Sequence, residues 1–516
     1  MGYQYHPMQM HLHTCHQPGS SMEGHMYNAA SLGMHYIRFT DHDVRTGPKE
    51  FPCNCFDFTK GALVYEDYSG KECGWMASED AQVTFDGESM ILEKGSVEFF
   101  SSGRRHTVSL LADVTLKVGL ECDGQVMLDV RLSQRPPEHK PAHLYYEIHQ
   151  CKKAEDGLYY LHLSQDVPEK MGGLDNVFDT LRIAVDGHGH CRIHHFEIEA
   201  KYGFDEVIQR QRVLADKIGQ CYGIKPFVTT EISAAGQHKN CFSTKVPVID
   251  YQARNYKVTQ AEAIAHVQAY GGIFSYNHPF EKYKRMTIPA QEIPRIVQRD
   301  AAAMIAYKVW GASLIEVGFL NGRAGFGLAE HLRLWDLLSL GGVFITGYGD
   351  SDSHYSDQGW FEGHNFAAWI AADEQTAFPV PEEEFIASMK AGRLYTGDPV
   401  FLKGAVELTC EGAPMGAILS IEDHDKRKRE MTFTMQSPEQ DWKMRLIIDG
   451  EVAHEQRIDK TEEFSFSFQV APIHPVSFAR VEVYNASGRC ILLTNPIYLV
   501  RTAEYAGELP VERTTR

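Results

Sequence analysis

The feature that most limits the fold of this chain is a change of pattern that occurs along it and then reverses. Residues 1–50 read as a strand, a short helix and a second strand, and residues 201–397 again alternate between helical and strand-like segments. Residues 51–200, between them, are short alternating hydrophobic runs instead. Alternating helices and strands indicate a parallel sheet or barrel. Because both flanks share this pattern, we expect one α/β domain that is split by an all-β insertion.

The insertion and the end of the chain both have the pattern of antiparallel sandwiches. In residues 51–200, runs such as "AQVTFDG" and "QVMLDVRLSQ" are separated by turns that contain Gly or Asp-Gly, which is typical of such a fold. The texture of this segment resembles a jelly-roll domain of the kind found in carbohydrate-binding modules. Residues 398–503 predict a second, smaller sandwich, and residues 504–516 predict a flexible tail.

Composition excludes several classes of partner. The 516 residues carry a formal net charge of -19, so we expect no general attraction to nucleic acid or to an anionic membrane. No apolar run is long enough to span a bilayer, and the N-terminus has neither the basic start nor the apolar core of a signal peptide. The 11 cysteines are scattered, which predicts reduced thiols and a cytoplasmic protein. A homo-oligomer is compatible with the sequence.

Histidines and acids follow the predicted strands of the α/β part. His11 and His13 are two residues apart, so a strand directs both side chains to one face. Glu231 lies within the strand-like "TTEIS", where an unpaired buried charge would be costly; it could meet an arginine or bridge two metal ions. The carboxyl ends of strands build the active site in βα barrels. The candidate ligands at such ends are His11, His13, His42, Glu231, His238, His278, Asp352 and His354.

The mixture of carboxylates and imidazoles suits Zn, Mn or Fe. A structural site of the cysteine-rich kind is not expected, because Cys15 is the one cysteine near the pattern. The simpler interpretation of His42, which stands beside Asp41 and Asp43, is a polar loop tip. A second histidine-rich stretch, "DGHGHCRIHH" at 186–195, falls on a predicted hairpin of the insertion and is interpreted as surface.

The segments "MHLHT", "FTDHD", "VTTEIS", "SYNHP" and "GDSDSH" together resemble the polymerase and histidinol phosphatase (PHP) family, in order and in strand-end context. The resemblance covers roughly residues 8–50 and 201–397. The stretch "GQHKN" and the tail "TNPIY" (494–498) are similar to the branch of that family named after carbaryl hydrolases.

The resemblance implies a distorted (β/α)7 barrel with two or three divalent metal ions in its mouth. The first ion would be held by His11, His13, Glu231 and Asp352. Glu231 would bridge to a second ion, held also by His238 and His278. A third would be held by His42, His354 and a residue from the loop after His13.

The sequence departs from the family at that last position. Pro18 and Gly19 stand where the family usually has Asp or His. His16 is our preferred substitute, with Gln17 or Glu23 as alternatives, although Glu23 also fits a helix cap. A site for two ions is the other possibility.

The expected activity is hydrolysis of phosphoesters by a metal-bridging hydroxide. Asp352 or His354 could pass a proton to the leaving group, and Arg45 could meet an anionic group of the substrate or form a surface ion pair. Hydrolysis of a carboxyl or carbamate ester is the alternative that the carbaryl-hydrolase likeness implies. A carbohydrate-binding protein with a merely structural metal site, or a hydrolase of a small sugar-linked ester, are further possibilities that the two sandwiches raise.

Overall fold

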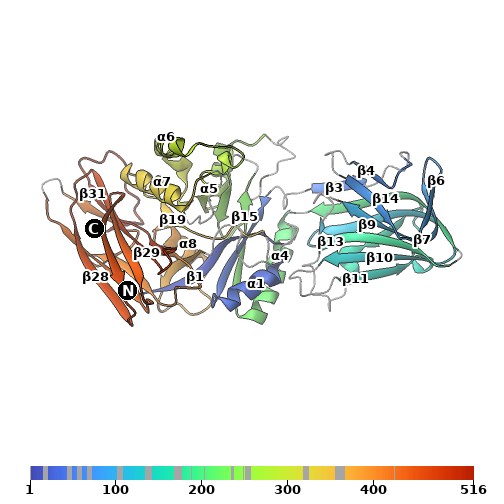
Figure 1. Cartoon of the computed structure of the whole chain (residues 1–516), viewed down its shortest axis with the longest axis horizontal. Coiled ribbons are helices and arrows are strands. Elements are labelled where there is room, and N and C mark those ends of the chain that lie inside the picture. The colour runs from blue at the N-terminus through green and yellow to red at the C-terminus, as the bar shows by residue number, and fades with distance from the viewer. Residues whose placement is uncertain are drawn as a thin grey trace.

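The computed structural model arranges the chain in three parts along its long axis (Figure 1). The insertion lies at one end, the C-terminal strands lie at the other, and the α/β part lies between them. The structure describes residues 2–14, 21–43, 49–54, 61–66, 72–101, 108–133, 142–167, 177–187, 189–202, 204–233, 237–247, 249, 257–317, 325–354, 366–422 and 425–515.

The α/β part is built on one curved sheet whose inner strands are buried. β1 pairs in parallel with β2, and β2 pairs in parallel with β15. β17, β18 and β19 are also parallel to one another, whereas β16 runs antiparallel to both of its neighbours, β15 and β17. The bounds are β1 (Tyr3–Leu12), β2 (Tyr36–His42), β15 (Lys225–Ile232), β16 (Lys239–Phe242), β17 (Ile273–Tyr276), β18 (Leu314–Glu316) and β19 (Thr346–Tyr348).

This sheet forms a half-barrel. The segment after β19 returns to the end of β1, where Leu12 and Ser353 form an isolated parallel bridge and the His13 amide donates to the Ser353 carbonyl at 3.1 Å. The first half of β1 pairs instead with β20 (Ala367–Asp373), which runs antiparallel to it and continues the sheet outward. The expectation of a mixed α/β fold is therefore confirmed, but a complete (β/α)7 barrel is not shown.

Helices cover this sheet and carry local signals of their own. In α1 (Met22–Ser31) the Ser21 hydroxyl caps the first turn by accepting from the Gly24 amide at 3.0 Å. α4 (Phe204–Tyr222) packs against β15 and against α1, and its Tyr222 hydroxyl donates to Glu23 at 3.0 Å. The remaining long helices are α5 (Gln260–Ala269), α6 (Ile293–Ala306), α7 (Leu328–Leu340) and α8 (Glu382–Lys390). None of the helices in the described part of the chain has the length and apolarity to cross a bilayer.

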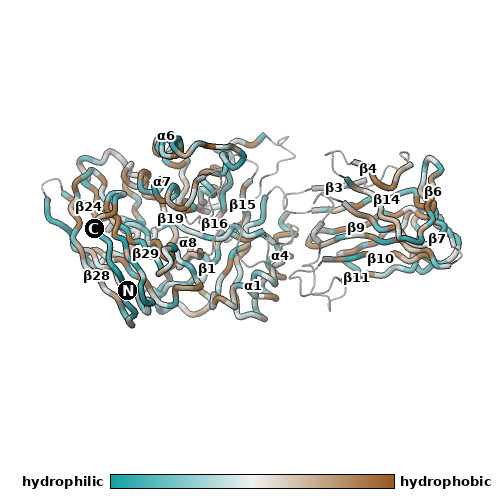
Figure 2. The backbone as a smooth tube through the Cα atoms, viewed as in Figure 1, coloured by the Kyte–Doolittle hydropathy of each residue, from teal (hydrophilic) through white to brown (hydrophobic). Residues whose placement is uncertain are grey.

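The insertion consists of antiparallel strands packed as a sandwich around a core of their own. Its strands alternate buried and exposed residues, visible as brown and teal along β9 (Figure 2). β7 (Met90–Ser101) belongs to both layers, because it pairs with β14 before Gly95 and with β13 from Gly95 onward. Gly95 has a φ of 80°, which other residues rarely adopt, and allows the strand to turn there. The main strands are β9 (Asp113–Asp123), β10 (Val126–Ser133), β11 (Ala142–Glu147), β12 (Tyr159–His162), β13 (Val177–Val185) and β14 (His190–Tyr202).

The C-terminal strands continue the central sheet rather than standing apart from it. β21 (Leu394–Gly397) pairs with β30 (Cys490–Thr494), and β30 pairs with β29 (Val476–Tyr484). β22 (Val406–Cys410), β25 (Arg429–Gln436) and β28 (Glu463–Val470) form a second layer over a shared core. In the last residues, β32 (Thr514–Thr515) pairs in parallel with β24 (Ile418–Ile421), and Arg513 donates to the Lys390 carbonyl at 3.0 Å.

Candidate metal centre

The α/β sheet brings the predicted ligands together at one end. His11 lies near the end of β1, and His13 follows that strand. His42 ends β2 and is paired in register with Glu231 of β15. The others lie at or just beyond the ends of their strands on the same side. His238 precedes the antiparallel β16, His278 follows β17, and Asp352 and His354 follow β19.

Glu231 is the centre of this group. One of its oxygens, Oε1, lies 3.4 Å from His11 Nε2, 3.2 Å from His238 Nδ1 and 3.6 Å from His278 Nε2. The other, Oε2, lies 2.6 Å from His42 Nδ1 and 3.9 Å from His13 Nε2. The two oxygens of this one carboxylate therefore face different sets of imidazoles.

Asp352 forms a second contact point for the same rings. Its Oδ1 lies 3.3 Å from His11 Nε2, 3.2 Å from His13 Nε2 and 3.7 Å from His354 Nδ1. Its Oδ2 lies 3.5 Å from His278 Nε2. The φ angles of Asp352 and His278 are 47° and 42°, in the left-handed region, and such strain is found where the surrounding structure needs a particular side-chain direction.

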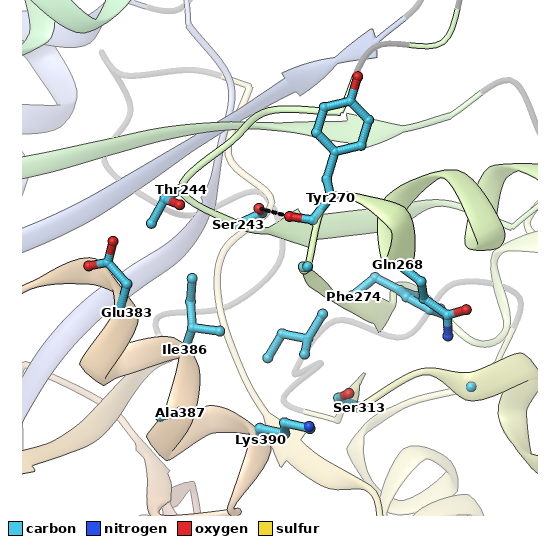
Figure 3. Close-up of a pocket in the computed structure, with 14 residues that line it drawn as sticks. Ser243, Thr244, Gln268, Tyr270, Phe274, Ser313, Glu383, Ile386, Ala387 and Lys390 are labelled. Atoms are coloured by element: carbon cyan, nitrogen blue, oxygen red, sulfur yellow. Dashed lines mark hydrogen bonds between the residues drawn. The ribbon is translucent and has the colours of Figure 1, made fainter.

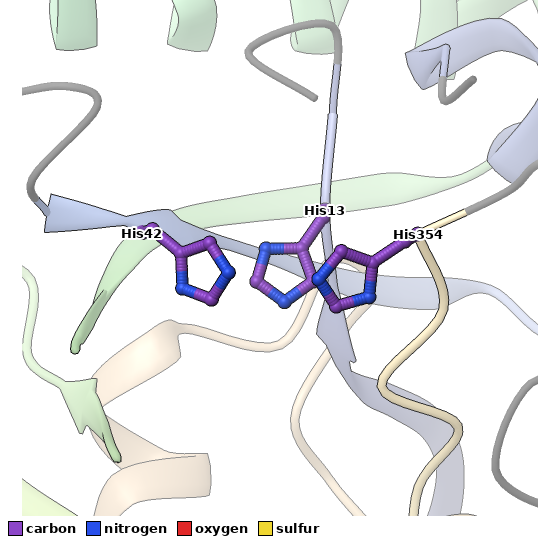
Figure 4. A group of neighbouring side chains, drawn as sticks. All are labelled: His13, His42 and His354. Carbon is purple, nitrogen blue, oxygen red and sulfur yellow. The ribbon is translucent and has the colours of Figure 1, made fainter. Parts of the chain in front are cut away.

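The third predicted group, which is His42 and His354 with a residue from the loop after His13, lies only partly within the described residues. His13, His42 and His354 lie close enough to share an ion, and His13 stacks on His354 with 4.0 Å between ring centroids (Figure 4). The ring centroids of His13 and His42 are 4.5 Å apart. His13 is thus a neighbour of both described members of this group, His42 and His354. His16, the preferred substitute, and Arg45 lie outside the described residues.

The charge of the centre favours bound cations. Glu231, Asp352, Glu316 and Asp350 are all buried around His11, and buried carboxylates require compensation. Burial by itself would raise the pKa of Glu231, but His238, His11 and His42 outweigh it and hold that pKa well below its usual value. Burial, with His354 and His42 nearby, lowers the pKa of His13, so its neutral form, the one that binds metals, is favoured.

The directions in which the candidate ligand atoms point also suit a bound ion. His11 Nε2 is fully buried and forms no hydrogen bond, although it points at carboxylate oxygens of Glu231 and Asp352. Imidazole nitrogens and carboxylate oxygens within 4.8 Å of one another also form the groups His11–Glu231–His278 and His42–Glu231–His238. This donor set suits Zn, Mn or Fe.

Glu316 is a functional residue that sequence reasoning missed. One of its oxygens accepts from His11 Nδ1 at 2.9 Å, and the other lies 2.5 Å from His278 Nδ1 and accepts from the His278 amide at 2.8 Å. An ionised carboxylate can only accept, so both rings carry their proton on Nδ1 and turn Nε2 toward Glu231 and Asp352. The signal was available, since Glu316 interrupts the apolar run "SLIEVGF" as Glu231 interrupts "TTEIS".

Asp41 and Asn277 support the ligands without contacting an ion site themselves. Asp41 accepts from the Thr14 amide at 2.7 Å and from Gln211 at 2.7 Å, which fixes the chain directly after His13. Asn277 donates to Glu231 Oε1 at 3.0 Å and so restricts the rotation of this carboxylate.

The centre opens on one side. The side chains of His42, His238 and His354 are 14%, 26% and 20% exposed, whereas those of His11, His13 and Glu231 are fully buried. A substrate can therefore approach past these partly exposed histidines. A separate cavity of about 590 Å³ lies at the other end of the sheet, beside the start of β17, and is lined by Ser243, Phe274 and Lys390 among others (Figure 3).

Comparisons with known proteins leave the family of the chain unassigned. No family model matches it, and no curated protein is similar. One solved structure, a two-domain protein from Bacteroides vulgatus ATCC 8482 that contains a predicted PHP-like metal-dependent phosphoesterase, aligns over 96% of each chain at 13% identity, with a TM-score of 0.35. Vicilin from Corylus avellana (hazelnut) aligns over 84% of each chain at 10% identity, with a TM-score of 0.11. TM-scores this low do not establish a shared fold, and the carbaryl-hydrolase branch gains no support.

Proposed function

We propose that this protein is a hydrolase that uses two or three divalent metal ions, and that phosphoesters are its substrates. The observation that carries the proposal is the position of Glu231, whose two oxygens face separate sets of histidines. A carboxylate shared in this way is the usual bridge between adjacent ions in two-metal sites. The motifs that resemble the PHP family supply the same residues in the same order.

The residues of the chain divide the work between holding ions and handling protons. His11, Asp352 and His278 would hold one ion beside Oε1 of Glu231, and His42 with His13 and His354 would hold another beside Oε2. Ions bound there would lower the pKa of a water molecule and stabilise negative charge on the ester oxygens. A barrel of the PHP type is the fold that we propose for the complete α/β part.

His354 is suited to move a proton to the leaving group. Its side chain is partly exposed, and its Nδ1 lies 3.0 Å from the Asp352 carbonyl. An imidazole is a general acid or base near neutral pH. Asp352, buried among His11 and His13, is better placed to hold an ion, and Arg45 remains a proposed contact for the anionic group of the substrate.

The bond that is cleaved can be determined by substrate comparison. Purified protein reconstituted with Mn²⁺ or Zn²⁺ should hydrolyse p-nitrophenyl phosphate or bis-p-nitrophenyl phosphate faster than p-nitrophenyl acetate. Turnover of the acetate alone would replace the phosphoesterase proposal by the carboxyl or carbamate ester alternative. A small ester, rather than nucleic acid, is the proposed substrate because the chain is strongly acidic.

Substitution of a ligand separates catalysis from a structural metal site. Glu231→Gln keeps the shape of the side chain but removes the shared charge, and it should lower kcat by roughly 100-fold or more, because the ions supply several kcal/mol of transition-state stabilisation. Glu384→Gln is the matched control, since Glu384 lies in α8 and accepts from the Thr376 hydroxyl at 3.1 Å. Metal binding without hydrolysis of any of these esters, together with binding of glycans, would favour a carbohydrate-binding protein instead.

A further inference from the structure

The insertion holds two cysteine thiols in contact. The scattered positions of the cysteines along the chain did not predict this pair. Cys122 of β9 and Cys191 of β14 lie directly opposite each other in the antiparallel ladder, and their Sγ atoms are 2.9 Å apart. Directly opposed residues on antiparallel strands have Cα atoms about 4.5–5.5 Å apart, within the range of about 4.4–6.8 Å that a disulfide spans. The pair can therefore close without movement of the backbone strands.

The two sulfur atoms differ in their surroundings. Cys191 is fully buried in the core of the sandwich, whereas Cys122 is only partly buried at the edge of that core. The contact with Cys191 lowers the pKa of Cys122, burial opposes this, and the ammonium of Lys153 lowers it further. The same contact and, after it, burial raise the pKa of Cys191. Cys122 is thus the thiol that reaches its reactive thiolate form first.

A cavity lies beside this region of the insertion. It has a volume of about 610 Å³ and is lined by Tyr159, Cys151 and Lys153, among others. Lys153 donates to the Leu120 carbonyl at 3.0 Å, two residues before Cys122, and its ammonium also lies over the Tyr159 ring at 5.7 Å. The pKa of Tyr159 is raised by burial and then by Cys122, Cys151 and Cys191, so all three thiols act on this one ring.

We propose that Cys122 and Cys191 form a site of reversible oxidation, in which a small-molecule disulfide such as oxidised glutathione converts them to a cross-strand disulfide. The Cys122 thiolate attacks one sulfur of the small disulfide and releases one small thiol. Cys191 then gives up its proton and attacks the Cys122 sulfur, and the second small thiol leaves. In total, two protein thiols are oxidised and one small disulfide is reduced to two thiols. The link would join the two strands that carry the core of one layer of the sandwich.

Peptide mapping of the whole protein tests this proposal. The protein, first reduced and then freed of reductant, is incubated in mixtures of oxidised and reduced glutathione, its remaining thiols are alkylated, and it is digested without reduction. We expect the peptides of Cys122 and Cys191 to be joined, with a mass lower by two hydrogen atoms, and we expect dithiothreitol to separate them. Free alkylation of both residues, while the exposed Cys221 becomes glutathionylated, would overturn the proposal.

Two variants establish which thiols take part. Cys122→Ser should abolish the linked peptide, whereas Cys151→Ser should leave it unchanged, although Cys151 lines the adjacent cavity. A linked peptide between Cys122 and Cys151 in the wild-type protein would contradict the assignment. The mapping of wild-type protein is decisive even if Cys122→Ser does not fold. Metal content should be the same in both redox states, so this test is independent of the proposed hydrolase activity.

Discussion

Glu316 joins two imidazole rings that belong to different strands. It accepts from His11 Nδ1 and lies beside His278 Nδ1, and the two rings stack with an interplanar angle of 15° and centroids 5.3 Å apart. Burial would raise the pKa of Glu316, but His278 and His11 lower it far below its usual value, so the carboxylate remains a strict acceptor. One residue thus sets the direction of two candidate ligands at once.

Replacement of this carboxylate should weaken metal binding without unfolding the protein. Glu316→Gln keeps the volume but can donate from one end, which permits the wrong tautomer in one of the rings. We expect metal affinity, measured by competition with a chelator, to fall roughly 10- to 100-fold, as for other residues that orient metal ligands. Glu384→Gln serves again as the control. Unchanged affinity in Glu316→Gln would show that the rings are held by the ions alone.

At the scale of elements, Asn495 ties the C-terminal strands to the strand that precedes Asp352. Its side chain accepts from the Gly347 amide and donates to the carbonyls of Gly347 and Leu394, each at 2.8 Å. It therefore fastens β19 to β21 at a point where neither strand pairs with the other. In the sequence, Asn495 belongs to the tail motif "TNPIY" (494–498). Only the structure shows that its partners are backbone groups of the central sheet.

Loss of this side chain should be costly. Asn495→Ala leaves three buried backbone groups without partners, and each such group costs about 1–3 kcal/mol, so we expect the free energy of unfolding to fall by roughly 3 kcal/mol or more. Urea denaturation measures this change. Asn485→Ala, in the turn where Asn485 accepts from the Ser487 and Arg489 amides, should cost about 1 kcal/mol. Equal losses in the two variants would contradict the role given to Asn495.

The sequence predicted the position of the centre better than the connections of the sheet. Imidazoles and acids at strand ends, such as His42 and Glu231, could be found because parallel strands bring their carboxyl ends to one edge. The reversal of β16 could not be predicted, because a strand of four residues carries no signal of its own direction. The role of Glu316 was not predicted from the sequence, because an isolated acid in an apolar run resembles a paired core residue until its partners are known.

At the scale of the whole molecule, the C-terminal strands and the α/β part share buried charges. Arg480 of β29 donates to both oxygens of Asp336 in α7, each at 2.8 Å, and also donates to Glu482 at 2.7 Å. All three groups are buried. The two parts are therefore joined by a charged contact as well as by the continuous sheet, and the C-terminal strands are not an independent appendage.

Breaking this contact should be strongly destabilising. Asp336→Ala leaves Arg480 as a buried charge with one partner fewer, and we expect a loss of roughly 3–5 kcal/mol in the free energy of unfolding. The exposed pair of Arg445 and Glu455, 2.5 Å apart, provides the comparison, because Glu455→Ala should cost no more than about 1 kcal/mol. A small loss in Asp336→Ala would mean that the two parts unfold independently.

The most direct test of the centre is a crystal structure of the metal-loaded protein with anomalous data at the absorption edges of Zn and Mn. We predict at least two ions, one bound by each oxygen of Glu231, with His11 on one ion and His42 on the other. Absence of ions from Glu231, or ions found only at the histidines of 186–195 in the insertion, would contradict the account.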